Sequence, residues 1–291
     1  MKMKQPVVVG LSGGLGNQLF QYSAGRALAL RLNAPLLLDT AWFRGRRDRE
    51  YALSPFRIAA AADGGSQWWP DVTVAIWSRI SRRWGATRLG AAIFREPHFH
   101  FAPAFDEIHA PVYLEGYWQS PRYFAHIRTT LLRELVPRAA MPSVCQPILD
   151  AIRNCNAICV HIRRGDYVSN PIAARTHGLC PLDYYTAALA ALPKSTTSHC
   201  FVFSDAPDWV RENLHLDCKM TVVDVNNEKN AHWDLYLMSA CRHFIIANSS
   251  LSWWAAWLGC VPGKQVAAPL QWFKSDDRNI RDLLPAQWVR V

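Results

Sequence analysis

Short apolar segments alternate with longer amphipathic ones near both ends of the chain. Residues 7–10 (VVVG) and 35–39 (PLLLD) are typical of buried strands, and the helix between them, which we expect to begin at Asn17, has one apolar face. Further strands are predicted at 111–115, 157–162, 200–203, 221–224, 243–247 and 265–268, and further helices at 124–135, 182–192, 207–213, 231–241 and 251–258. Strands that alternate with helices in this way favour parallel sheets.

This alternation is interrupted in two places. Residues 40–105 show no clean period, and residues 137–147 contain three prolines and are typical of a linker. We therefore predict an α/β protein of two halves, an N-terminal domain over residues 1–145 and a C-terminal domain over residues 146–291.

Composition excludes several classes of protein. Half of the 291 residues are hydrophobic and only 19% are charged, which is typical of a folded core and not of a disordered chain. Apolar stretches fall short of the about 18 residues that a membrane-spanning helix needs, and no secretion signal is recognisable, so we expect a cytoplasmic protein. Cys155, Cys159 and His161 are interpreted as strand and core residues and not as zinc ligands, so no metal site is predicted.

The charge is unevenly distributed. The net charge is +9, of which +7 falls in residues 1–150, and arginine supplies 25 of the 32 cations. Arginine and tryptophan together suit an anionic membrane surface, so we expect peripheral contact with the inner leaflet, with a solvated basic face as the alternative. The residues concerned are Arg44, Arg46, Arg47, Arg49, Arg79, Arg82, Arg83, Arg88, Trp42, Trp68, Trp69, Trp77 and Trp84.

The first candidate site is the segment GGLGNQLFQY, residues 13–22, directly after a strand. Glycines there let the backbone approach a ligand, and the helix N-terminus offers free N–H groups to an anion. Asp39 follows the second strand as in dinucleotide-binding folds, but Leu19 stands where the third small residue of that motif belongs. An NAD(P)-dependent oxidoreductase built on the Gly13–Gly16 loop therefore stays an alternative, as does a simple tight turn.

The second candidate site lies where three strands of the C-terminal half end. The segment HIRRGDY, residues 161–167, carries two adjacent arginines that are suited to bidentate contact with phosphate. Because parallel strands present their carboxyl ends at one edge, we expect the polar residues there to converge. They are His161, Arg163, Arg164, Asp166, Ser204, Asp205, Asn248, Ser249 and Ser250. Trp253, Trp254 and Trp257 follow at helical spacing and are predicted to pack in the core.

Three further segments accompany these two: GYWQSPRYF (116–124), FSD (203–205) and ANSSLSWWAAW (247–257). With these segments in this order, the chain resembles the α-1,2-fucosyltransferases of glycosyltransferase family 11, in the bacterial form without a membrane anchor. The resemblance implies a GT-B architecture, in which two Rossmann-like halves face across a cleft and the second binds GDP-fucose. It also implies inverting transfer of fucose to the 2-hydroxyl of a terminal galactoside of a surface glycan such as an O-antigen. No metal, no further cofactor and no nucleic acid is expected.

The resemblance also implies roles for single residues. Arg163 would contact the β-phosphate and stabilise the departing GDP, and Asp234 would accept hydrogen bonds from guanine. Arg164 and Asp166 would orient the site, His161 would lie near the nucleotide, and Ser249 and Ser250 would bind the diphosphate. Gly14, Gly16 and Asn17 would face the cleft from the first half. From their places at the strand ends, Ser204, Asp205 and Asn248 are predicted to bind the donor as well. Arg163 and Asp166 are predicted to be catalytic. Glu115, with Asp39, is a strand-end carboxylate and a candidate general base. A non-catalytic protein that binds glycan or membrane through its basic surface remains a further alternative.

Overall fold

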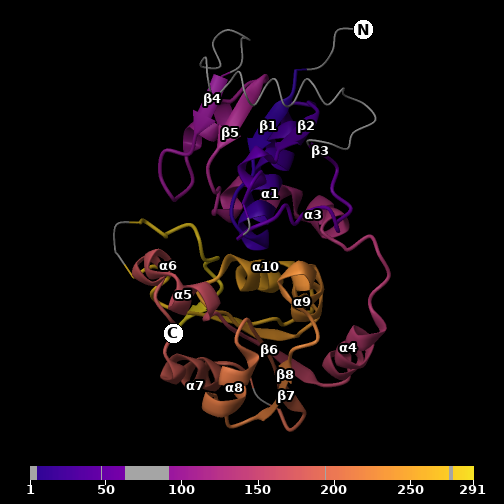
Figure 1. Ribbon diagram of the computed structural model, residues 1–291, viewed down its shortest axis with the longest axis vertical. Coiled ribbons are helices and arrows are strands. Elements are labelled where there is room, and N and C mark those ends of the chain that lie inside the picture. The colour runs from indigo at the N-terminus through magenta and orange to yellow at the C-terminus, as the bar shows by residue number, and fades with distance from the viewer. Residues whose placement is uncertain (1–4, 47, 63–91, 194, 275–277) are drawn as a thin grey trace. The chain divides into compact units, whose positions relative to one another are not determined.

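The computed structural model describes residues 5–46, 48–62, 92–193, 195–274 and 278–291 (Figure 1). The chain divides into two compact units, Met1–Val136 with Asn279–Leu283 and Pro137–Arg278 with Leu284–Val291. The division thus lies at the start of the proline-containing stretch, whereas the sequence placed it after residue 145. Contacts explain the difference, because the Val136 carbonyl accepts a hydrogen bond from Arg57 N, while Cys145 is buried against Asn226 of the second unit.

A five-stranded parallel sheet forms the centre of the first unit, in the order β3-β2-β1-β5-β4 (Figure 1). Its strands are β1 (Val7–Gly10), β2 (Leu36–Asp39), β3 (Ala61–Ala62), β4 (Ala92–Arg95) and β5 (Val112–Glu115). Its helices are α1 (Leu15–Arg31) and α3 (Arg128–Glu134), with 3-10 turns at Ala41–Phe43, Pro103–Glu107, Pro121–Tyr123 and Ala125–Ile127. The predicted strands 7–10, 35–39 and 111–115 are confirmed, and the predicted helix 124–135 begins as a 3-10 turn.

Two features of this sheet were not visible in the sequence pattern. Strands β3 and β4 lie in the stretch without a clean period, because both are short edge strands and β4 is only half-buried. Helix α1 begins at Leu15 and not at Asn17, so Gly16 and Asn17 belong to its first turn. The helix packs closely on the sheet at Gly25, where a Cβ would lie 2.2 Å from Val9 Cγ2.

A six-stranded parallel sheet forms the centre of the second unit, in the order β11-β10-β9-β6-β7-β8. The strands are β6 (Asn156–Ile162), β7 (Ser198–Ser204), β8 (Lys219–Val223), β9 (His243–Ile245), β10 (Val266–Ala268) and β11 (Val289–Arg290). The helices are α4 (Gln146–Arg153), α5 (Gly165–Ser169), α6 (Pro171–Thr176), α7 (Leu182–Ala191), α8 (Pro207–Asn213), α9 (Ala231–Ser239) and α10 (Ser250–Leu258), with 3-10 turns at Ser143–Cys145 and Glu228–Asn230. The five strands and four helices predicted for this half are confirmed; α4, α5, α6 and β11 were not predicted.

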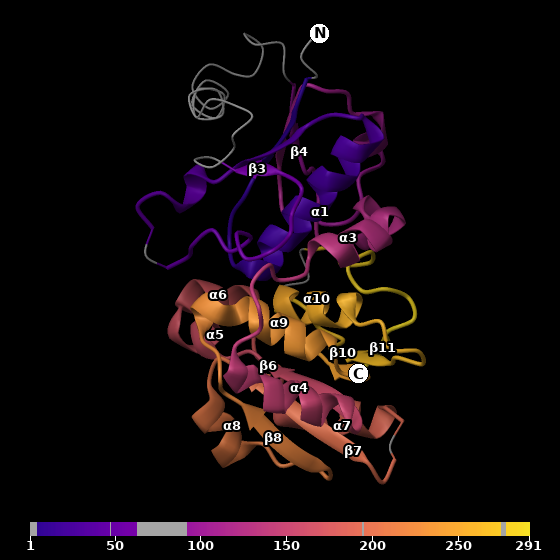
Figure 2. The same cartoon turned by 90° about the vertical axis from the view of Figure 1, so that its right-hand side faces the viewer.

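Helices cover both faces of this sheet, as a fully parallel sheet requires. Helices α9 and α10 pack together on one face, and α7 and α8 lie on the other (Figures 1 and 2). The prediction that the tryptophans of α10 pack in the core is confirmed, since Trp253 and Trp254 are fully buried and Trp257 is nearly so. Each such side chain stabilises the fold by about 1.5–3 kcal/mol relative to an exposed one. Within the described residues, none of the helices combines the length and apolarity needed to cross a bilayer.

Candidate functional site

Strand register brings most of the predicted donor-site residues of the second unit to one edge of the sheet. Ile162 of β6 lies opposite Ser204 of β7, so the residues that follow, Arg163 and Asp205, are neighbours. On the other side, Val160 of β6 lies opposite Ile245 of β9, which places the start of α10 beside the same edge. The prediction that three strand ends converge is therefore confirmed for this unit.

Arg163 is held by two carboxylates. Its Nη2 and Nε donate to Asp166 Oδ1 at 2.7 and 3.0 Å, and its Nη1 lies 3.0 Å from Asp205 Oδ2. The guanidinium also lies 5.7 Å from the centre of the Tyr167 ring. These contacts fix the orientation of Arg163. Because a quarter of its side chain is exposed, the guanidinium is also accessible to an anion.

The charges around Arg163 follow from burial and from these partners. Burial lowers the pKa of the Arg163 guanidinium, but Asp205 and Asp166 outweigh it and leave the pKa above its usual value, so the side chain is cationic at every relevant pH. Burial is also the main reason why the pKa of His161 falls to about 4, with Asp205 opposing the shift. His161 is therefore a neutral, almost fully buried imidazole near the end of β6.

Asp205 also shapes the turn that leads from β6 into α5. Its Oδ1 accepts a hydrogen bond of 2.8 Å from Arg164 N, and a Cβ on Gly165 would lie only 2.6 Å from Oδ2. Glycine is therefore required at residue 165 for this carboxylate to reach the arginine. The Arg164 guanidinium lies 3.6 Å from the centre of the Trp209 ring on α8. Trp209 was not predicted as a site residue, although it lies only four residues after FSD (203–205).

The residues before α10 serve two different purposes. The Ser249 and Ser250 backbone forms the helix start, where the first N–H groups lack intrahelical partners and suit an anion. The Asn248 side chain instead serves the protein, because Nδ2 donates to the carbonyls of His177, Gly178 and Trp272. Asn248 was predicted to bind the donor directly; the structure assigns its amide to holding these loops together.

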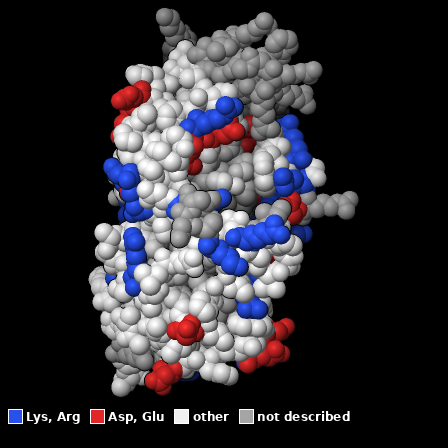
Figure 3. Space-filling view, turned by 90° about the vertical axis from the view of Figure 1, so that its left-hand side faces the viewer, with Lys and Arg blue, Asp and Glu red and all other residues white. Residues whose placement is uncertain are grey.

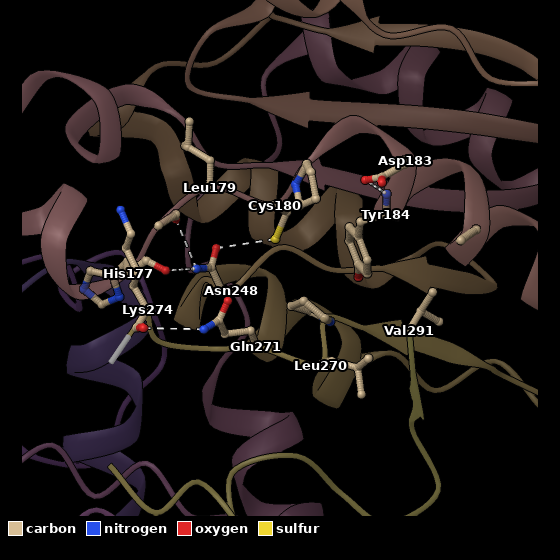
Figure 4. A pocket seen from close by; sticks show the side chains of 14 residues that line it. His177, Leu179, Cys180, Asp183, Tyr184, Asn248, Leu270, Gln271, Lys274 and Val291 are labelled. Atoms are coloured by element: carbon tan, nitrogen blue, oxygen red, sulfur yellow. Dashed lines mark hydrogen bonds between the residues drawn. The ribbon is translucent and has the colours of Figure 1, made fainter. Parts of the chain in front are cut away.

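A cavity of about 620 Å³ is lined by Asn248 and by residues of α7, among them Asp183 and Tyr184 (Figure 4). Its walls include Leu179, Cys180, Tyr184 and Leu270, with Asp183 and Lys274 as charged members. The Cys180 thiol points to Asn248 Oδ1 at 3.6 Å. None of the clustered residues Arg163, Asp166 and Asp205 lines this cavity, so it is separate from the arginine cluster.

Asp234 lies in the first turn of α9, away from the arginine cluster in sequence. Burial raises the pKa of its carboxyl to about 6, although Asn226, which donates to Asp234 Oδ1 at 2.7 Å, lowers it. Asn226 is itself contacted by the Cys145 thiol at 3.6 Å. Asp234 is therefore a partly desolvated acceptor with a fixed orientation, as the predicted contact with guanine requires.

In the first unit, the glycine loop is held by glutamines of α1. Gln18 Nε2 donates to the Gly13 carbonyl, and Gln21 Oε1 accepts from Ser12 N while its Nε2 donates to the Gly116 carbonyl. Gly13 has a φ of +75°, a conformation that favours glycine. This network explains why glutamines recur in GGLGNQLFQY: they shape the loop, and they tie it to the turn after β5.

Asn17, like Gln21, has a polar side chain that contacts that same turn. Its Oδ1 accepts a hydrogen bond of 2.8 Å from Gln119 Nε2. Gly14 is the N-cap of α1 and Gly16 lies buried in its first turn, so their contribution to a site is the backbone alone. Gln119 was not predicted, although it stands in the segment GYWQSPRYF that supported the resemblance.

Three carboxylates of the first unit, each at or next to the end of a strand, occupy different environments. Asp39 is buried, and its oxygens accept from Ala41 N at 2.9 Å and Tyr113 Oη at 2.8 Å. This disfavours Asp39 both as a base and as a ribose ligand. Glu115, more than half exposed, lies 2.9 Å from Arg95 Nε. Glu96, which the sequence analysis missed, is half-buried next to β4.

Several expectations concern metal ions and the basic surface. In the parts of the chain that the structure describes, no three His, Cys, Asp or Glu side chains are grouped as metal ligands, and all eight cysteines are free thiols. On the face drawn in Figure 3, basic side chains form separate groups, with neutral and acidic surface between them. Of the predicted arginine and tryptophan set, Arg47 and all members from Trp68 to Arg88 lie outside the described residues. Arg46 stacks 3.9 Å from the Trp42 ring centre.

Comparisons with known proteins agree with this geometry. A family model described as Glycosyl transferase family 11 matches residues 95–290. An alpha-1,2-colitosyltransferase of Escherichia coli is 32% identical, over 98% of this chain and 98% of its own length. The O-antigen biosynthesis glycosyltransferase WbnK of Escherichia coli is 28% identical over 97% and 99% of the two chains. A galactoside 2-alpha-L-fucosyltransferase of Caenorhabditis elegans is 31% identical over 55% of this chain and 47% of its own.

Among solved structures, a mutant of Arabidopsis thaliana FUT1 in complex with GDP is similar with a TM-score of 0.50 and 12% identity, over 90% of this chain and 70% of that one. The two parallel α/β units are those of a GT-B glycosyltransferase. The chain belongs to glycosyl transferase family 11, which confirms the resemblance found in its motifs. Membership in this family excludes the two alternatives, an NAD(P)-dependent oxidoreductase and a non-catalytic binding protein.

Proposed function

We propose that the protein transfers L-fucose from GDP-fucose to the 2-hydroxyl of a terminal galactoside, with inversion at the sugar C1. The observation that carries the proposal is Arg163, oriented by Asp166 and Asp205 at the end of β6. A guanidinium fixed in this way suits the β-phosphate, on which negative charge develops as the C1–O bond breaks. Arg164, Ser249, Ser250 and Asp234 would complete the donor site. The relative from Caenorhabditis elegans, named as a galactoside 2-alpha-L-fucosyltransferase, supports this donor and acceptor.

A second donor has specific support. The relative that is 32% identical over nearly the whole chain is named as an α-1,2-colitosyltransferase. Colitose is L-fucose without the 3-hydroxyl, so the two GDP-sugars share the diphosphate, the guanine and most of the ring. A site that hydrogen-bonds the 3-hydroxyl would discriminate strongly against the sugar that lacks it.

The test supplies GDP-fucose and GDP-colitose separately with terminal galactosides as acceptors. We expect a kcat/KM at least about 100-fold higher for GDP-fucose, because a bonded hydroxyl leaves unsatisfied partners when it is absent. The product linkage is checked by NMR. A preference for GDP-colitose would show that colitose, and not fucose, is the transferred sugar, and it would leave the proposed mechanism unchanged. If neither donor gave transfer to any galactoside, the proposal would be overturned.

We also propose that the reaction needs no metal ion. Arg163 and Arg164 provide positive charge at the end of β6 where the diphosphate is proposed to bind, so a divalent cation is not required to stabilise the leaving group. Transfer is therefore expected to persist at its full rate in excess EDTA. The same assay with added magnesium or manganese is the control. Loss of activity in EDTA that either ion restores would contradict this proposal.

The cellular role that fits is synthesis of a surface polysaccharide such as an O-antigen. WbnK, similar over 97% of this chain, is named as an O-antigen biosynthesis glycosyltransferase. An acceptor of this kind is a galactose-terminated, lipid-linked glycan at the inner leaflet. Peripheral attachment of a cytoplasmic protein to that leaflet stays a prediction, since most of the arginines and tryptophans concerned lie outside the described residues.

A further inference from the structure

Glu96 is a carboxylate built into the carboxyl edge of the first sheet. It directly follows β4 and its backbone N–H donates to the Glu115 carbonyl at 2.8 Å. Its side chain accepts hydrogen bonds from the turn after β5: Oε2 lies 2.8 Å from Tyr117 N, and both oxygens lie about 3 Å from Trp118 N, at 3.0 and 3.1 Å. Glu96 is half-buried, so its carboxylate is fixed without being sealed off.

The turn that Glu96 holds is unusual in two ways. Trp118 has a φ of +59°, which a residue with a Cβ rarely adopts, and it is fully buried. A Cβ on Gly116 would lie 2.5 Å from Glu96 Cβ and 2.8 Å from Glu96 Oε2, so glycine is required for the carboxylate to fit. Strained backbone of this kind persists where surrounding contacts enforce it, and it clusters at functional sites.

The same turn is joined to the glycine loop. Gln21 of α1 bridges the Gly116 carbonyl and Ser12, and Gln119 donates to Asn17. Glu96, the 116–119 turn and the loop before α1 thus form one hydrogen-bonded assembly. This assembly carries a carboxylate, three amide side chains and a backbone loop, groups that suit recognition of sugar hydroxyls.

The other strand-end carboxylates of this unit fit a proton acceptor less well. Asp39 is buried with hydrogen bonds to Ala41 N and Tyr113 Oη. Glu115 is exposed, and its Oε2 is occupied by an ion pair with Arg95 Nε at 2.9 Å. Glu96 accepts hydrogen bonds from backbone N–H groups, and no cationic side chain of the described residues pairs with it, so its carboxylate keeps lone pairs free for an acceptor hydroxyl.

We propose that Glu96 is the general base of the transfer reaction, an inference that rests on the proposed function. Its carboxylate takes the proton from the acceptor hydroxyl as that oxygen bonds to C1 of the donor sugar. The C1–O bond to the β-phosphate breaks at the same time, and GDP departs with the electron pair. The proton then passes from the Glu96 carboxyl to water, which restores the carboxylate.

The protonation behaviour of Glu96 agrees with this role. Burial raises the pKa of its carboxyl to about 7, although the N–H groups of Trp118 and Tyr117 lower it. A base is most effective when its pKa lies near the working pH. Because only the ionised form accepts a proton, kcat should fall as the pH drops below about 7.

The test compares Glu96→Gln with Glu107→Gln, an exposed glutamate of the same unit. We expect Glu96→Gln to lower kcat by about 100- to 1,000-fold and to remove the fall of kcat at low pH, while the affinity for GDP stays unchanged. Glu107→Gln should behave as the wild type. Because Glu96 also supports the turn, Glu96→Asp is measured as well, and it should restore part of kcat together with the low-pH fall.

Several outcomes would overturn the proposal. Wild-type kcat in folded Glu96→Gln would do so, as would a low-pH fall of kcat that disappears in Glu115→Gln and persists in Glu96→Gln. A loss in Glu96→Gln that Glu96→Asp reproduces in full, with an equally lowered unfolding temperature, would assign Glu96 to structure alone. Failure of the wild-type protein with every donor would instead refute the proposed function, so the two failures are distinguishable.

Discussion

Replacing Arg163 by lysine is expected to lower kcat by about 100- to 1,000-fold and to leave the fold intact. Lysine keeps the positive charge, but its single ammonium cannot donate to Asp166 and Asp205 and also present a planar pair of N–H groups to a phosphate. The arginine makes these contacts with three different nitrogens, Nε, Nη1 and Nη2. The loss should fall mainly on kcat, because charge on the leaving group grows in the transition state.

The measurement is steady-state kinetics with the preferred donor, together with circular dichroism and thermal unfolding. Arg175→Lys is the matched control, because Arg175 is an exposed arginine near the end of α6. Turnover at the wild-type rate in a folded Arg163→Lys protein would remove Arg163 from the catalytic role. An equal loss in Arg175→Lys would show that the assay responds to arginine content and not to this site.

Asp234→Asn is expected to weaken GDP binding by about 10- to 100-fold. In the proposed donor site the carboxylate accepts two guanine N–H groups, whereas the amide oxygen that replaces it would accept one. The effect should depend on pH. Burial raises the pKa of Asp234 to about 6, so the carboxylate is present above that pH and is lost below it. The dissociation constant for GDP should therefore rise up to about tenfold per unit as the pH falls below 6.

Calorimetric titration with GDP between pH 5 and about pH 8 measures this, with ADP as the comparison nucleotide. In Asp234→Asn the low-pH rise should vanish and the preference for GDP over ADP should shrink. Asp208→Asn, at a side chain that is 91% exposed on α8, is the control. A wild-type dissociation constant that stays flat through pH 6, or an unaltered preference for GDP in Asp234→Asn, would exclude Asp234 from guanine recognition.

The donor side of the second unit could be predicted closely because its information is local. Strands β6 and β7 have seven residues each with continuous buried runs, and polar side chains begin where β6 ends, as in Ile162 followed by Arg163. Parallel pairing then forces those ends to one edge. Asn248 is the exception: its position beside Ser249 suggested a ligand contact, and only the loops folded around it give its amide three carbonyl acceptors.

The first unit was harder to predict because its edge strands carry little pattern. Strand β4 has four residues, half of them exposed, so Glu96 stood in a segment without a period and was not recognised. The domain boundary was misplaced for a similar reason, since residues 137–145 have no apolar repeat to tie them to either core. Helix α1 started earlier than expected because Gly14, and not Asn17, is its N-cap.

The sequence by itself determined the parallel α/β class, the family, and the arginine-bearing strand end, because periodicity and contiguous motifs express all three within short segments. Only the tertiary structure decided which carboxylates are available. Asp39, Glu96 and Glu115 all follow or end strands of one sheet, yet burial, backbone N–H groups and the Arg95 guanidinium give them different environments. Those partners come from segments distant in sequence, and the protonation of a carboxylate depends on what surrounds it in space.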